Sequence, residues 1–120
     1  MAGAACTTAG AIGAKFIIAF THSGFTASLV SKFRPTTPII AFTTKEDVLR
    51  RMAMYWGVYP GFMRPLIGTD EMIKAVEESL LKERRVKRGD RIVITASTPI
   101  PGAGKTNLLK LHIIGEASEA

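Results

Sequence analysis

Cysteine is almost absent from this sequence, which contains only Cys6 among its 120 residues. A single thiol can form neither an internal disulfide nor a thiolate cage for zinc. The sequence therefore excludes a disulfide-stabilised scaffold, and a reducing cytoplasm is the expected compartment. Long apolar runs are lacking too. The longest hold four or five residues, such as 16–20, whereas a membrane-spanning helix needs roughly 18 or more. We expect no membrane partner.

Acidic residues are the scarcer charged class, with 10 Asp and Glu against 16 Lys and Arg, so the formal net charge is +6. The Asp, Glu, His and Cys residues form no cluster with metal-site spacing, and we expect no metal or other cofactor in this chain. Apolar residues make up 47% of the sequence, which is enough for a hydrophobic core. This length and composition predict one compact domain over residues 1–120.

Short apolar segments alternate with amphipathic ones along the chain. Apolar, partly β-branched runs predict buried strands, and apolar spacing of three and four predicts helices. The expected strands are 15–20, 38–42, 58–60, 91–96 and 108–114. The expected helices are 2–13, 25–33, about 44–56 (with Thr43 and Thr44 as its cap) and 69–85.

This alternation predicts an α/β fold, in which a mostly parallel sheet is covered by helices on both faces. The last two expected strands are joined by a loop, residues 97–106, that contains no helix. A parallel crossover needs a dozen or more residues, so the fifth strand is expected to be antiparallel. The prediction is a single domain with a mixed five-stranded sheet.

Two short motifs are typical of catalytic sites, but neither is complete. Gly104-Lys105-Thr106 resembles the end of a phosphate-binding P-loop, yet that motif needs a glycine where Pro99 stands. A glycine-rich loop that folds over an anion is the better interpretation of this segment. His22-Ser23-Gly24 resembles a nucleophile elbow, but the flanking glycines of that motif are absent. His112 has no obvious carboxylate partner in the sequence, and we expect no catalytic residue.

The segment 21–26 is better interpreted as an anion site. Thr21, Ser23 and Thr26 supply hydroxyl groups at the start of an expected helix, and Gly24 lets the backbone turn there. A helix N-terminus also carries a partial positive charge. The alternative is that these hydroxyls only cap the helix, and the residues alone leave both interpretations open.

Six of the ten residues in 82–91 are basic. Such a cluster could bind nucleic acid, but no aromatic residue is interleaved and no nucleic-acid motif accompanies it. Basic residues at a helix C-terminus complement the helix dipole, and this is the preferred interpretation. We expect no nucleic-acid partner.

Seven segments in the same order resemble one known family, the C-terminal regulatory domain of pyruvate kinase. They lie at 21–27, 30–35, 37–41, 56–60, 69–72, 89–96 and 104–112, and the resemblance covers about residues 2–115. It implies a three-layer α/β/α sandwich with sheet order 3-2-1-4-5 and an antiparallel last strand.

In that family, the catalytic centre with its Mg²⁺ and K⁺ lies in a separate barrel, and no part of this sequence resembles that barrel. The resemblance thus implies an allosteric effector-binding and oligomerisation domain that is not catalytic alone. The parent glycolytic kinase transfers phosphate from phosphoenolpyruvate to ADP, and the catalytic domain is then a partner. The alternative is a free-standing phosphate-metabolite sensor, or a small uncharacterised enzyme of the same fold.

The resemblance also implies the site residues. The effector, a sugar phosphate or AMP, is expected to bind two loops, at Thr21, His22, Ser23, Gly24, Phe25, Thr26, Gly102, Gly104, Lys105 and Thr106. The last strand is expected at a sheet edge, where a second copy of the chain pairs with it. The expected interface residues are Asn107, Leu109, Leu111 and Ile113. We expect a dimer of the isolated chain and a tetramer of the parent enzyme.

Overall fold

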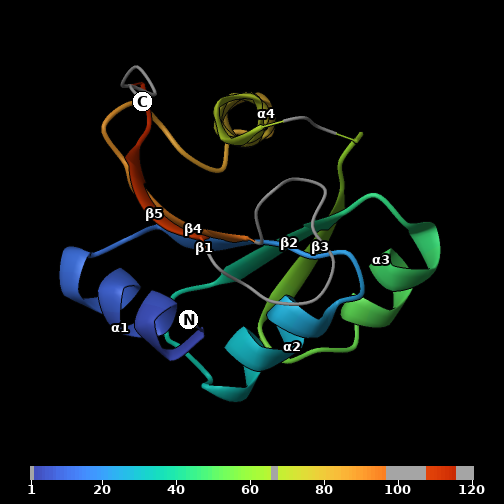
Figure 1. The fold of residues 1–120 in the computed structure, drawn as a ribbon. Coiled ribbons are helices and arrows are strands. Elements are labelled where there is room, and N and C mark those ends of the chain that lie inside the picture. The colour runs from blue at the N-terminus through green and yellow to red at the C-terminus, as the bar shows by residue number, and fades with distance from the viewer. Residues whose placement is uncertain (1, 66–67, 97–107, 116–120) are drawn as a thin grey trace.

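The computed structural model describes residues 2–65, 68–96 and 108–115. Helices and strands alternate along the described chain, as expected (Figure 1). Their bounds are α1 Ala2–Ile12, β1 Phe16–Phe20, α2 Phe25–Lys32, β2 Ile39–Thr43, α3 Glu46–Met52, β3 Val58–Phe62, α4 Thr69–Lys82, β4 Arg91–Ala96 and β5 Leu108–Ile113.

The five strands form one sheet in the order β3-β2-β1-β4-β5. Strand β1 lies at its centre, with Ile17 paired to Ile39 of β2 on one side and to Val93 of β4 on the other, both in parallel. Strand β5 runs antiparallel to β4. The predicted mixed sheet and its strand order are both confirmed.

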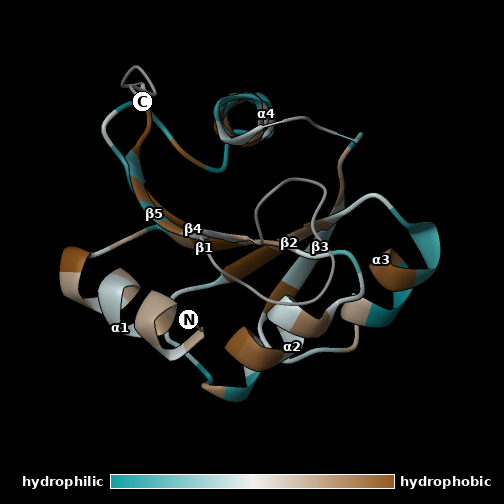
Figure 2. Cartoon of the chain, viewed as in Figure 1, coloured by the Kyte–Doolittle hydropathy of each residue, from teal (hydrophilic) through white to brown (hydrophobic). Residues whose placement is uncertain are grey.

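Helices cover both faces of the sheet, which gives the molecule three layers. Helix α4 lies on one side of the sheet, and α1, α2 and α3 lie on the other (Figure 1). Alternate side chains of β1 serve the two cores: Ile18 packs on the α4 side, and Ile17 and Ala19 pack on the other. In Figure 2 the hydrophobic colour gathers on the central strands of the sheet, whereas the outward side of α4 is hydrophilic. A strand with two buried faces reads as a continuous apolar run, which is why these segments could be found in the sequence.

Small side chains bring α1 close to the sheet. Ala5 and Ala9 are fully buried, and α1 packs against β4 and α2. The methyl side chains at these positions allow the helix to approach the strands closely. The alanine-rich composition of this segment therefore reflects its close packing, as its sequence indicates.

Several element boundaries differ from those expected. Thr43 does not cap α3 but ends β2, where its Oγ1 accepts a hydrogen bond of 3.3 Å from the Lys45 backbone N–H. Helix α3 starts at Glu46 and ends at Met52, four residues before the expected end. Strand β3 extends to Phe62 and includes Pro60. A proline fits there because β3 is an edge strand, where one row of N–H groups faces away from the sheet.

Helix α4 ends at Lys82, earlier than the expected Arg85, because the backbone reverses there. Arg84 has a left-handed backbone with φ 58°. Its N–H donates to the Leu81 carbonyl at 3.0 Å, and the Arg85 N–H donates to the Leu80 carbonyl at 2.9 Å. This pair of bonds is the Schellman motif, which ends a helix and usually places glycine at the left-handed position. An arginine at that position hid the helix end from the sequence pattern.

Candidate functional site

The loop 21–24 lies at the place where open α/β sheets bind ligands. Strand β1 leads by way of α2 to β2 on one side, whereas β4 lies on its other side. Strands β2 and β3 are therefore added on one side of β1, and strands β4 and β5 are added on the other side. The strand order reverses between β1 and β4. Ligands bind such sheets in the crevice at the carboxyl ends of the strands, at this switch point. The loop that follows β1 is the segment whose hydroxyl groups predicted an anion site.

A single peptide group organises this loop. The Gly24 N–H donates to Thr21 Oγ1 at 2.8 Å, and the hydrogen bond is buried. Gly24 has φ 89°, a conformation that glycine adopts without strain. A Cβ added to Gly24 would lie 3.5 Å from side-chain atoms of Val48, Met52 and Tyr55. That is an ordinary contact, so the backbone angle and not the space requires glycine here.

The predicted hydroxyl groups lie in different surroundings. Thr21 and Thr26 are buried, while Ser23 is exposed and its Oγ accepts a hydrogen bond of 3.3 Å from the Phe25 N–H. The N-cap position of α2 is Gly24, which has no side chain. Thr21 therefore closes the loop and does not cap the helix by the usual contact to its second or third N–H.

His22, Ser23 and Phe25 present the exposed surface of the loop, and Phe25 is 56% exposed. These residues surround the start of α2, whose first turn carries no acidic side chain. An anion that approaches this helix start meets no like charge from that turn. The other predicted effector loop, with Gly102, Gly104, Lys105 and Thr106, lies outside the described residues.

Arg51 is a part of this site that the sequence analysis missed. It lies in the last turn of α3, and its Nη1 donates to the Ser23 carbonyl oxygen at 3.0 Å. The two residues are 28 positions apart in the sequence, so no local pattern reports the contact. The only signal available was the pair of basic residues, Arg50 and Arg51, at the end of a helix that follows the neighbouring parallel strand.

Thr95 is a second residue that was missed. It lies one position before the end of β4, beside Ala19 of β1, and is fully buried. Within the described part of the chain its Oγ1 has no hydrogen-bond partner. A buried hydroxyl without a partner costs free energy, so it is a feature to be explained. It belongs to the strand that leads into residues 97–107.

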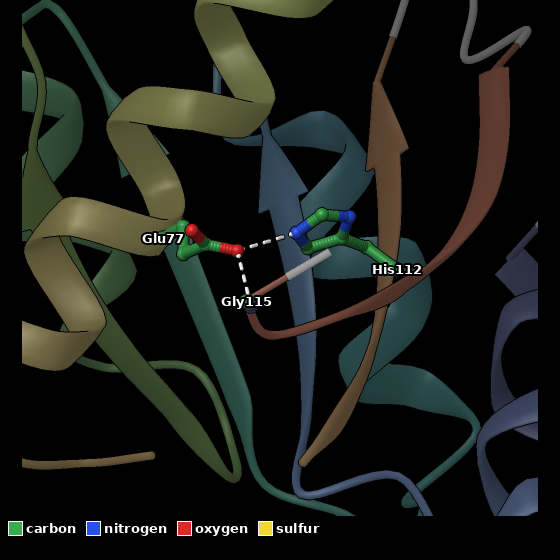
Figure 3. A network of polar contacts seen from close by, with 3 residues as sticks. All are labelled: Glu77, His112 and Gly115. Carbon is green, nitrogen blue, oxygen red and sulfur yellow. Dashed lines mark hydrogen bonds and ion pairs between the residues drawn. The ribbon is translucent and has the colours of Figure 1, made fainter. Parts of the chain in front are cut away.

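A carboxylate partner for His112 exists, contrary to the interpretation of the sequence. Figure 3 shows Glu77 of α4 between two donors. Its Oε2 lies 2.8 Å from His112 Nε2 and accepts a hydrogen bond of 2.9 Å from the Gly115 N–H. The His112 side chain is 4% exposed and that of Glu77 is 24% exposed. This network ties the end of β5 to the helix that covers it.

The environment of Glu77 lowers the pKa of its carboxyl below the ordinary value. Burial acts in the opposite direction and raises this pKa. The hydrogen bonds from Gly115 and His112, together with the nearby charges of His112 and Arg88, outweigh that effect. The carboxylate is therefore ionised at neutral pH and accepts both hydrogen bonds.

The predicted interface residues share one face of β5. In the antiparallel register with β4, Leu109, Leu111 and Ile113 are alternate residues, and β5 is an edge strand of the sheet. Leu111 is 45% exposed, Ile113 is half-buried and Leu109 packs against the core. Asn107 lies outside the described residues. No partner chain is present, so the interface stays a prediction.

The described residues contain no group of three His, Cys, Asp or Glu side chains that could hold a metal ion. In the same part of the chain, no helix is long and apolar enough to cross a bilayer. Cys6 is half-buried, and burial raises the pKa of its thiol. It therefore lacks the lowered pKa that activates a nucleophilic cysteine.

Comparison with known proteins gives one consistent result. Residues 1–112 match the family model described as pyruvate kinase, alpha/beta domain. A pyruvate kinase of Sporosarcina psychrophila is 40% identical over 113 residues, which are 94% of this chain and 19% of the relative. One from Geobacillus stearothermophilus is 43% identical over 100 residues, 83% of this chain and 17% of the relative. One from Clostridium acetobutylicum is 40% identical over 109 residues, 91% of this chain and 23% of the relative. The chain thus spans about a fifth of the length of these relatives.

Proposed function

Since this chain belongs to the family of pyruvate kinase alpha/beta domains, we propose that it is the effector-binding and oligomerisation part of a pyruvate kinase. The parent enzyme would transfer phosphate from phosphoenolpyruvate to ADP in glycolysis, in the cytoplasm. The catalytic domain would be the partner of this chain, and the chain alone would carry no catalysis. Its ligand would be a phosphorylated small molecule, a sugar phosphate or AMP.

The observation that carries the proposal is the loop 21–24 at the switch point of the sheet. It follows the central strand, opens onto the start of α2 and contains a left-handed Gly24. Helix starts at such places bind phosphate because free N–H groups and the helix dipole favour an anion. Ser23 and Thr26 would contribute hydroxyl groups, and Gly24 would hold the turn that presents them, its own N–H staying on Thr21 Oγ1.

The second effector loop would complete the site from the other side of the switch point. Gly102, Gly104, Lys105 and Thr106 follow β4, the strand next to β1. In this proposal Lys105 pairs with the bound phosphate and the loop closes over the effector. The same segment leads directly into β5. Closure of the loop would therefore change the position of β5 at the predicted interface.

Oligomerisation would use the free edge of β5. An exposed apolar edge strand invites pairing with another strand, and Leu111 at that edge is 45% exposed. Antiparallel pairing of two copies across a two-fold axis would join two sheets into one. Asn107, Leu109, Leu111 and Ile113 would then lie at the contact.

Thermal unfolding in the presence of phosphorylated metabolites tests the effector part of the proposal. A ligand that binds only the folded state raises the melting temperature, by an amount that grows with its concentration. We expect AMP or a sugar phosphate to do so for the parent chain, and Ser23→Asp to abolish the shift by like-charge repulsion.

The matched control is Thr36→Asp, which adds the same charge at an exposed position in the connection between α2 and β2. This connection lies at the amino ends of the parallel strands, whereas the loop 21–24 lies at their carboxyl ends. Thr36→Asp should keep the ligand-induced shift. A Ser23→Asp protein that is stabilised as much as the parent would place the effector elsewhere.

A further inference from the structure

We propose that Arg51 is a recognition residue of the effector site, and that it makes the site selective for phosphate carrying two negative charges, as in a phosphate monoester. This inference rests on the proposed function and adds to it the residue that selects the doubly charged phosphate group. It starts from the 3.0 Å hydrogen bond between Arg51 Nη1 and the Ser23 carbonyl oxygen.

The first step concerns the peptide group between Ser23 and Gly24. In a trans peptide the C=O and the N–H point in opposite directions. Here the C=O is held by Arg51 and the N–H by Thr21 Oγ1 at 2.8 Å. Both ends of one peptide plane are therefore fixed, one by a neighbouring helix and one from within the loop. Arg51 positions the loop before any ligand arrives, which reduces the entropy lost on binding.

The second step concerns charge. Asp47 stands four residues before Arg51 in α3, at a spacing that allows an ion pair. The structure forms none: the ion pair between described residues is Arg85–Glu83, and His112–Glu77 becomes one only when the imidazole is protonated. Among the described residues, the exposed guanidinium of Arg51 thus has no carboxylate partner, and it is held against the loop that precedes α2.

The third step concerns hydrogen-bond capacity. A guanidinium has five N–H donors in a planar fork that matches phosphate. One donor of Arg51 is used by Ser23, which leaves four for a ligand. The helix start and Arg51 together present positive potential from two elements. A phosphate dianion is attracted strongly by both elements. A monoanionic diester is attracted less, because it carries less charge and has fewer free oxygens to accept hydrogen bonds.

The neighbouring Arg50 provides a matched control. It lies in the same last turn of α3, is exposed like Arg51 and has no hydrogen bond to the loop. Arg50→Gln and Arg51→Gln therefore remove the same charge from adjacent positions, and only one of them removes the contact to Ser23. Arg51→Lys keeps the charge but loses the planar fork.

The test measures dissociation constants by NMR titration, with inorganic phosphate at pH 8 as the dianion and dimethyl phosphate as the monoanion. We expect Arg51→Gln to weaken phosphate binding about tenfold, the loss of one charge-assisted hydrogen bond. Arg50→Gln should change the dissociation constant for phosphate less than about twofold. The dissociation constant of Arg51→Lys should lie between those of Arg50→Gln and Arg51→Gln. The preference for phosphate over dimethyl phosphate should shrink in Arg51→Gln, which a merely structural role would not produce.

Two other outcomes would overturn the inference in distinguishable ways. If Ser23→Asp abolishes phosphate binding but Arg51→Gln behaves like Arg50→Gln, the effector site stands and the role of Arg51 is wrong. If the parent chain binds phosphate no better than Ser23→Asp, the proposed function at this loop fails and the inference fails with it. Thermal unfolding of each variant confirms that the comparison is between folded proteins.

Discussion

Replacing Glu77 tests whether its network fixes the end of the sheet. Glu77→Leu removes the acceptor of two hydrogen bonds, at 2.8 Å from His112 Nε2 and 2.9 Å from the Gly115 N–H. The His112 side chain is only 4% exposed, so water cannot replace the lost partner. Gly115 is half-buried, and its N–H has better access to solvent.

The expected loss follows from these two donors. A buried donor without a partner costs roughly 1–3 kcal/mol, and the half-buried one costs less. We expect Glu77→Leu to lower the free energy of unfolding by about 2–3 kcal/mol, which for a domain of this size is about 8–12 °C in melting temperature. Glu77→Gln keeps one acceptor oxygen and should lose about half as much.

The assay is thermal and urea unfolding, with Glu78→Leu and Glu78→Gln as controls. Glu78 is the next residue of α4 and is exposed, so the same substitutions there should change stability by less than about 0.5 kcal/mol. Equal effects at the two positions would refute the reasoning, because of these two glutamates it is Glu77 that bonds to His112 and Gly115 in the described structure.

The same variants predict a pH dependence. The pKa of Glu77 is lower in the folded chain than its ordinary value. A lowered pKa contributes stability that is present above the ordinary value, about 4.3, and is lost as pH falls through the folded value. The stability difference between the parent and Glu77→Gln should therefore shrink as the pH falls below about 4.3. A difference that grows over that acid range would contradict this assignment.

Three further substitutions give sharp outcomes. Arg84→Gly should raise the free energy of unfolding by about 1 kcal/mol, because glycine removes the strain of a left-handed backbone at the end of α4, and Arg84→Ala should give no such gain. Gly24→Ala should cost about 1–2 kcal/mol in urea unfolding although its Cβ has room, because φ is 89°; an unchanged stability would show that the loop relaxes. Leu111→Lys should leave the fold intact and shift a dimer to monomer in sedimentation equilibrium, because it places like charges across the edge strand; a parent chain that is monomeric at hundreds of micromolar would remove the basis for this expectation.

Much of the fold could be predicted because its central strands are buried on both faces. A segment such as β1, Phe16–Phe20, is apolar without interruption, and such runs bounded by glycine or proline are visible in any sequence. The antiparallel β5 followed from the length of the loop before it. The strand order could not be derived from the residues and came from the family resemblance.

The boundaries that were wrong depend on tertiary structure. Thr43 has the side chain of a helix cap, but pairing with β3 extends β2 through it. Arg84 occupies the left-handed position that a sequence pattern expects glycine to mark. In both cases local preference favours one structure and the surrounding packing imposes another.

The candidate site likewise contains residues that the sequence predicts and residues that only the tertiary structure brings together. The loop 21–24 could be chosen from its hydroxyl groups and glycine, because those features are consecutive in the sequence. Arg51 and Glu77 contact residues 28 and 35 positions away. Such contacts follow from the order of the strands and the placement of α3 and α4, and no spacing rule reports them.

The most direct test of the central claim is an NMR titration of the ¹⁵N-labelled chain with AMP and with a sugar phosphate. The account predicts saturable shifts of the backbone amides of residues 23–27, at the start of α2, for at least one of these ligands. The same amides should not respond in Ser23→Asp. Saturable shifts confined to other parts of the sheet, or identical titrations of the parent and Ser23→Asp, would contradict the assignment of this loop as the effector site.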